Sequence, residues 1–201
     1  MTSDVLTKAE RADMIKLAKS VAIKSAAIIV QSRDGKTVLT KCNPNPTDHT
    51  LFNLAVCEMA DVEREARRVI WSLSGNDTRW SLCVDIVLKT VEGESMTLET
   101  WNISLSSELR DHNINTYALY SRFGIIIKSL LAISRVVPAY RYSRRQTPDT
   151  FVIDYRIYEG EPKRSNLGPN KKFRRELSPE TRHVMYSFLV CGRPAKNVYL
   201  R

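Results

Sequence analysis

The sequence lacks the short motifs that mark the common enzyme classes. Its seven glycines form neither the GxGxxG nor the GxxxxGK spacing of phosphate-binding loops. Its three histidines occur without HExxH spacing, and no Gly-x-Ser-x-Gly elbow is present. The four cysteines form no CxxC pair, which argues against a zinc site and favours reduced thiols. We therefore expect a protein without catalytic activity, metal or cofactor.

The sequence also lacks a long uncharged apolar run. Its most apolar stretch, 123–137, is interrupted by Lys128 and Arg135, so it is not expected to span a bilayer. The first residues, Met1-Thr2-Ser3-Asp4, have none of the features of a secretory signal. These features, with the unpaired cysteines, predict a cytoplasmic protein.

Charge is distributed unevenly along the chain. The 201 residues suffice for a single domain over 1–201 with its own core. The formal net charge is +9, but residues 1–120 contribute −2 and residues 121–201 contribute +11. The basic excess therefore lies in the last third of the chain, and this is the part expected to attract an anionic partner.

Hydrophobic periodicity predicts an α+β fold. Strict alternation over 80–105, broken at Val91-Glu92-Gly93-Glu94, is typical of a β-hairpin. Three-and-four spacing of apolar residues predicts three helices, and shorter alternating runs predict further strands. We expect a mostly antiparallel sheet packed against the helices. The expected helices are 7–31, 61–73 and 113–137, and the other expected strands are 38–40, 51–56, 151–158 and 183–190.

The predicted helix 113–137 is apolar almost all round, which indicates a largely buried helix at the centre of the fold. Its polar residues recur as one narrow strip. This strip either contacts a partner or packs at the edge of the core, with the charged ends of its long side chains extending to solvent. The candidate partner-binding residues are Ser121, Arg122, Lys128, Ser129 and Arg135.

Basic residues after this helix form a candidate anion site. Arg141, Arg144 and Arg145 are interleaved with Tyr140 and Tyr142, and arginine can bind phosphate or carboxylate with two hydrogen bonds. A phosphoprotein, an acidic lipid or a nucleic acid would each fit this chemistry. A second basic cluster over 163–182 is expected to be a solvated loop.

Two long segments resemble the amino-terminal HORMA domains of the autophagy-related protein 13 family. They are Lys128-Ser-Leu-Leu-Ala-Ile-Ser-Arg-Val-Val-Pro-Ala-Tyr-Arg-Tyr-Ser-Arg-Arg-Gln146 and Tyr155-Arg-Ile-Tyr-Glu-Gly160. Phe52-Asn-Leu-Ala55 and the Thr90-Val-Glu-Gly-Glu-Ser-Met96 hairpin agree as well, so the resemblance covers roughly residues 10–160. It implies a HORMA fold, with an antiparallel sheet packed against three helices and a largely buried central helix.

The resemblance implies a function without catalysis or cofactors. Such a domain pairs with a second HORMA protein, autophagy-related protein 101, and acts as an adaptor of the autophagy-initiation kinase complex. It also recruits a lipid kinase complex and a vesicle membrane protein to the preautophagosomal structure. The kinase-binding tail of the family has no counterpart here, so we expect a domain of a longer protein or a short form.

The family's fold adds two further expectations. Residues 161–201 would be a belt-like carboxy-terminal segment that carries the basic loop. Phosphate sensing through arginines, by analogy with some family members, would involve Arg141, Arg144, Arg145 and Arg156.

Two other classes of function stay open at this point. The charge of +11 over 81 residues is sufficient for a basic nucleic-acid-binding domain, although no RNA- or DNA-reading motif is present. The second is a HORMA module whose carboxy-terminal segment closes around a peptide.

Overall fold

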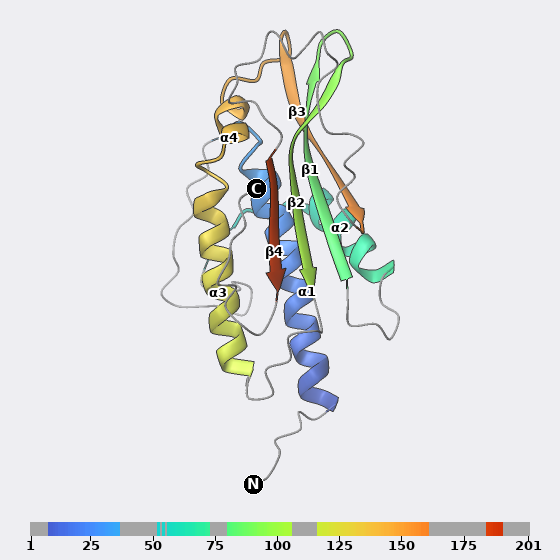
Figure 1. Cartoon of the computed structure of the whole chain (residues 1–201), viewed down its shortest axis with the longest axis vertical. Helices are drawn as coiled ribbons and strands as arrows, with labels where there is room; N and C mark the ends of the chain where they lie inside the picture. The colour runs from blue at the N-terminus through green and yellow to red at the C-terminus, as the bar shows by residue number, and fades with distance from the viewer. Residues whose placement is uncertain are drawn as a thin grey trace.

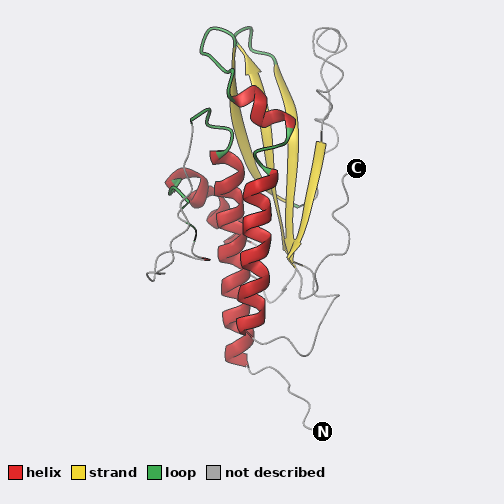
Figure 2. Ribbon diagram, turned by 90° about the vertical axis from the view of Figure 1, so that its left-hand side faces the viewer, coloured by secondary structure: helices red, strands yellow, loops and turns green. Residues whose placement is uncertain are grey.

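The computed structural model describes residues 8–36, 52, 54, 56–72, 80–105, 116–160 and 184–190. These residues form two layers, a sheet and a group of helices that cover one of its faces (Figures 1 and 2). The helices are α1 (Lys8–Gln31), α2 (Ala60–Ser72), α3 (Thr116–Ile133) and α4 (Pro138–Ser143). The strands are β1 (Trp80–Thr90), β2 (Ser95–Leu105), β3 (Phe151–Glu159) and β4 (Val184–Val190).

The sheet confirms the predicted hairpin and the mostly antiparallel pairing. Its strand order is β3-β1-β2-β4, with β1 antiparallel to both β2 and β3. The last strand, β4, runs parallel to β2. A bulge skips Leu98, so Ile86 pairs with Glu99 and Val87 pairs with Thr97. Alternation places Glu99 on the same helix-covered face as Trp101, and the bulge brings Met96, which pairs with the core residue Leu88, to that face as well.

Two predicted strands before α2 have different outcomes. The strand predicted over 38–40 lies outside the described residues. Of the strand predicted over 51–56, the structure describes Phe52, Leu54 and Val56, and all three are buried. Leu54 forms a single β-bridge rather than part of a longer strand.

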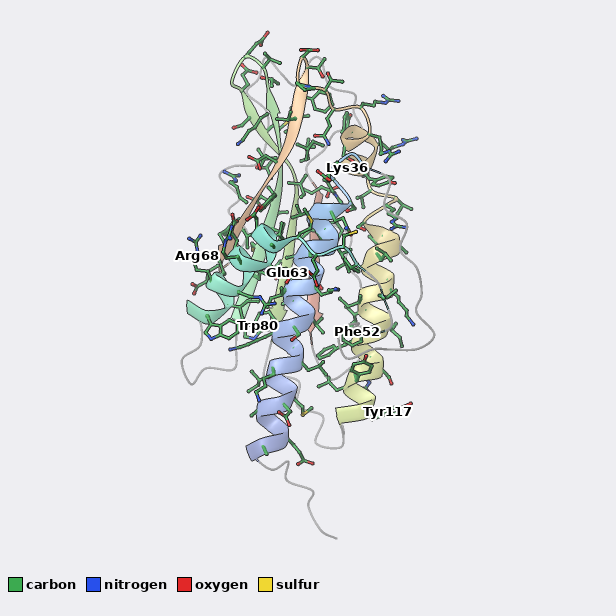
Figure 3. The ribbon with its side chains drawn as sticks, turned by 180° about the vertical axis from the view of Figure 1, so that it is seen from behind. Lys36, Phe52, Glu63, Arg68, Trp80 and Tyr117 are labelled. Carbon is green, nitrogen blue, oxygen red and sulfur yellow. The ribbon has the colours of Figure 1, made fainter. Side chains whose placement is uncertain are left out.

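The central helix is α1, not α3. In Figure 3, α1 lies between α2 and α3, and it contacts both of them as well as β1 and β2. Small residues such as Ala22 and Ala26, both fully buried, let the neighbouring elements approach α1 closely. The fold therefore has the expected largely buried central helix, but the prediction that the helix over 113–137 takes this place was wrong. On one side of α3 the apolar residues pack against the core, and on the other side they face solvent.

Pro138 starts a helix that the sequence analysis missed. Pro138 follows the predicted helix 113–137 and occupies the first turn of α4, where a backbone N–H would have no helical partner in any case. Side chains at and just after the end of α4 then hydrogen-bond carbonyl oxygens of the residues that directly follow α1. Ser143 Oγ donates to Ser32 O at 3.4 Å, Arg144 Nη1 donates to Gly35 O at 3.0 Å, and the following Gln146 Nε2 donates to Arg33 O at 3.0 Å.

A buried ion pair joins the ends of α1 and α3 to the sheet. Arg33 Nη2 donates to Glu99 Oε2 at 2.6 Å, and both side chains are 2% exposed. Arg33 Nη1 donates to the carbonyl oxygen of Ser134 at 3.0 Å, just after α3. Trp101 Nε1 donates to the same Glu99 oxygen at 2.9 Å, and the Arg33 guanidinium lies 5.4 Å from the Trp101 ring centroid.

Breaking this pair from either side should destabilise the domain strongly. Arg33→Met or Glu99→Gln leaves one buried charge without its counterion, so each is expected to lower the free energy of unfolding by about 3–5 kcal/mol. Urea denaturation at neutral pH measures this loss. Asp61→Asn is the control, because it breaks an exposed pair with Arg64 and should cost less than about 1 kcal/mol. Equal losses in the three variants would contradict this account.

Candidate partner-binding surface

The orientation of α3 about its own axis is fixed by what it packs against. Leu119, Phe123, Ile127 and Leu130 are buried between α3 and the rest of the core. Near the start of the helix, the Tyr120 hydroxyl accepts a hydrogen bond from the Phe52 backbone N–H at 2.8 Å, and the two rings stack with centroids 4.6 Å apart. These contacts hold α3 so that its opposite side faces solvent.

The exposed side of α3 is a continuous stripe of apolar and small polar residues. Tyr117 is 80% exposed, Ile125 is 66% exposed, and Val136, just beyond the helix, is 77% exposed. Figure 3 shows Tyr117 at the start of α3. Steps of three or four residues place all members on one side. We call this surface the α3 outer face, and its residues are Tyr117, Ser121, Ile125, Lys128, Ser129, Ala132 and Val136.

The structure divides the five predicted partner-binding residues into two groups. Ser121, Lys128 and Ser129 are exposed on the α3 outer face. Arg122 and Arg135 are half-buried beside it. The Arg122 Nη1 atom is buried, and no described residue accepts a hydrogen bond from it.

Sequence reasoning missed the apolar members of this face. The predicted helix 113–137 was expected to be largely buried, so its apolar residues Tyr117 and Ile125 were not expected to be exposed. Their positions relative to Ser121 and Lys128, three or four residues away, carried the signal that they share the exposed side.

The α3 outer face carries charge of a single sign. From Thr116 to Pro148 the sequence has no Asp or Glu, whereas Lys128 lies on the face and Arg122 and Arg135 lie beside it. An apolar stripe with a positive charge near its middle complements an apolar surface that carries carboxylates.

The predicted anion-binding arginines lie on two different elements. Arg141, Arg144 and Arg145 are exposed on α4 and directly after it, close to the end of α1. Figure 3 shows this end of the molecule around the labelled Lys36. Arg156 lies on β3, where its Nη2 donates to Asp85 Oδ2 at 3.2 Å and to Thr97 Oγ1 at 3.1 Å.

Asp85 organises the face of the sheet opposite to the helices. Its carboxylate is almost fully buried and also accepts hydrogen bonds from Thr100 Oγ1 at 2.7 Å and from the Tyr158 hydroxyl at 3.1 Å. Arg156 is the counterion of this buried carboxylate. Its guanidinium, though half-exposed, is therefore engaged within the sheet rather than available with the α4 arginines.

Two ionisable groups on the same face have displaced pKa values. Burial raises the pKa of the Cys83 thiol, and the nearby Asp85 charge adds to the increase, while a hydrogen bond from Asn102 opposes it. For Asp154, burial favours a higher pKa, but bonds from Lys89 and from the Tyr155 N–H outweigh it and lower the pKa. Among the described residues, no three His, Cys, Asp or Glu side chains gather as a metal site.

Comparison with known proteins gives a consistent family assignment. The model of the family described as "Autophagy-related protein 13" matches residues 72–187, more than half of the chain. Autophagy-related protein 13 of Mus musculus is 41% identical over 165 residues, which are 81% of this chain and 31% of that protein. The Drosophila melanogaster homologue is 38% identical over 187 residues, 86% of this chain and 35% of its own.

This chain belongs to the autophagy-related protein 13 family. It spans about a third of the length of the curated relatives that it matches. The matched residues 72–187 contain α3, the strands β1 to β3 and the first part of β4, so the α3 outer face lies within the part that defines the family.

Two further observations accompany the family assignment. A solved structure titled "Atg13 HORMA domain" covers 77% of this chain at 15% identity, with a TM-score of 0.38. Of the helices in the described part of this family member, none has the length and hydrophobicity needed to cross a membrane.

The raised pKa of Cys83 predicts a difference in thiol reactivity. Only the thiolate is alkylated, and both burial and the raised pKa reduce the thiolate available at Cys83. In the folded protein at mildly alkaline pH, iodoacetamide should modify the exposed Cys57 at least about tenfold faster than Cys83. Peptide mass spectrometry measures both rates, and unfolding in urea should make them similar. Equal rates in the folded protein would contradict the assignment of Cys83 as a buried, neutral thiol.

Proposed function

We propose that this chain is a non-catalytic adaptor module in autophagy initiation, and that its α3 outer face binds a second HORMA protein. The exposed apolar stripe on α3 is the observation that carries this proposal. Membership of the autophagy-related protein 13 family supports the biological setting. By resemblance, the partner is autophagy-related protein 101, and the pair would recruit the lipid kinase complex and the vesicle membrane protein to the preautophagosomal structure.

The distribution of exposed apolar side chains favours α3 over other surfaces. Six large hydrophobic residues are exposed in the described part of the chain, and three of them lie on the α3 outer face. The other three, Trp71, Val91 and Val152, lie on three separate elements or turns. Single exposed apolar residues are ordinary, whereas a contiguous row of them indicates a binding surface.

Charge on α3 favours a different protein as partner over a second copy of this chain. In a two-fold symmetric pair, the same face of each copy meets the other. Such a pair through α3 would bring Lys128, Arg122 and Arg135 of both copies together with no acidic residue of α3 to oppose them. A partner with carboxylates opposite Lys128 avoids this repulsion and gains electrostatic complementarity.

Ile125→Asp tests the proposal at the middle of the face. It places a charge in the apolar contact and should weaken the complex with autophagy-related protein 101 by at least about tenfold, a loss typical of a central interface residue. Lys128→Glu should weaken it by a smaller factor that shrinks at high salt. Both side chains are exposed, so neither substitution should disturb folding. Titration by isothermal calorimetry measures the affinities.

Arg68→Glu is the control, because Arg68 is also exposed but lies on α2, on the other side of α1 (Figure 3). It should leave the affinity unchanged. Unchanged binding by Ile125→Asp, with the same urea midpoint as the parent, would show that the α3 outer face is not the interface. Arg122 and Arg135 are less suitable for this test, since both are half-buried and their replacement would also affect packing.

The second candidate function is binding of a phosphate-bearing ligand at the α4 arginines. The observation that favours it is that the Arg141 and Arg145 side chains are exposed, and neither guanidinium makes a hydrogen bond or ion pair with another described residue. Arg144 lies between them in the sequence, and its Nη1 donates to Gly35 O at 3.0 Å. Guanidinium groups this close in sequence present several donors to one anion.

Joint replacement of Arg141, Arg144 and Arg145 by glutamine should abolish salt-sensitive binding to vesicles that contain phosphatidylserine. Arg156→Gln should leave that binding intact, because the Arg156 guanidinium is engaged by Asp85 and Thr97. Vesicle co-sedimentation at low and high salt measures both. Absence of binding by the parent chain at low salt would exclude this second function.

A further inference from the structure

The segment that joins α4 to β3 is exposed except at one anchoring residue. Gln146 is half-buried: its Nε2 donates to Arg33 O at 3.0 Å, and its Oε1 accepts from the Ile153 N–H at 2.8 Å. The residues on both sides of it, 144–145 and 147–150, are exposed. Gln146 therefore anchors the segment to the end of α1 and to β3, while the side chains on both sides of it face solvent.

Thr147 lies at the first position of a tight turn in this segment. The Thr150 N–H donates to the Thr147 carbonyl oxygen at 3.1 Å, and Pro148 occupies the second turn position, for which its fixed φ is suited. The hydroxyl groups of Thr147 and Thr150 lie 2.8 Å apart and share one hydrogen bond. Because both hydroxyls are exposed, breaking this bond costs little, about 0.5–1.5 kcal/mol at most.

We propose that Thr147 is a phosphorylation site for a proline-directed serine/threonine kinase. Pro148 follows the acceptor directly, and a residue before proline favours the extended backbone in which kinases bind their substrates. Arg144 and Arg145 precede the acceptor by three and two positions and add positive charge for an acidic kinase cleft. This assignment rests on observations independent of the α3 outer face.

The reaction is phosphoryl transfer from magnesium-bound ATP. The Thr147 Oγ atom attacks the γ-phosphorus, the new O–P bond forms, and the bond between the γ-phosphorus and the ADP oxygen breaks. The hydroxyl proton passes to the catalytic aspartate of the kinase. No oxidant or reductant is required.

The phosphate would enter a positively charged neighbourhood of this same chain. It adds a charge of about −1.5 to −2 and three acceptor oxygens next to Arg144 and Arg145. The exposed Arg145 guanidinium makes no hydrogen bond or ion pair with another described residue, so its donors are available to the phosphate. Phosphorylation at Thr147 would therefore offset the positive charge of Arg144 and Arg145, and hydrogen bonds from these arginines to the phosphate would hold the loop against the end of α4.

The test uses the whole chain, magnesium-ATP and a purified proline-directed kinase. Ser178-Pro179 is the one other Ser-Pro or Thr-Pro pair in the sequence, so Ser178→Ala serves as the parent. Intact and peptide mass spectrometry should show one phosphate on this parent, located at Thr147. Pro148→Ala should lower the initial rate at least about tenfold, because the acceptor is then poorly positioned.

Two matched variants separate phosphorylation from an effect on folding. Thr147→Val and Thr150→Val each remove one partner of the same hydroxyl pair, so their structural cost is alike. Adding Thr147→Val to the parent should abolish incorporation, whereas adding Thr150→Val should preserve it. Incorporation that survives Thr147→Val would overturn the proposal. So would a parent that takes up no phosphate while the kinase modifies a free peptide of residues 141–153.

Discussion

The buried pair between Arg33 and Glu99 is the contact on which the arrangement of the other elements depends. One guanidinium bonds the sheet through Glu99 and the end of α3 through Ser134, and it lies over the ring of Trp101. Because a buried charge must be paired, these groups hold α1, α3 and β2 in one relative position. Glu99 and Trp101 face the helices together because they are two residues apart on β2, opposite Ile86 and Val84 of β1.

This arrangement also determines which surface is left for a partner. The Ser134 carbonyl fixes the end of α3, and the contact between Phe52 and Tyr120 fixes the region near its start. With both ends held, the helix buries Phe123 and Ile127 against the core and turns Ile125 outward. The α3 outer face is thus a consequence of the core packing. Its apolar character is unexplained by the isolated domain and is accounted for by an adaptor role.

Local patterns predicted the elements well, because alternation and helical spacing are properties of neighbouring residues. The hairpin predicted over 80–105, the helix over 7–31 and the strand over 151–158 agree with the observed elements to within one residue at their ends. Long-range features could not be predicted. The Arg33–Glu99 pair joins residues 66 positions apart, and no local pattern marks it. The pairing of β4 with β2 and the engagement of Arg156 by Asp85 depend equally on the tertiary fold. At the candidate site, the polar residues were found from spacing, whereas Tyr117 and Ile125 were taken for core because hydrophobicity alone does not tell which side of a helix is covered.

Hydrogen exchange with and without autophagy-related protein 101 tests the central claim most directly. Peptides from 116–136 cover the α3 outer face, and peptides from 60–72 cover α2 on the opposite side of α1. The account predicts that the partner slows exchange in the α3 peptides and leaves the α2 peptides unchanged. Slower exchange in α2 or in the sheet, with α3 unaffected, would contradict it.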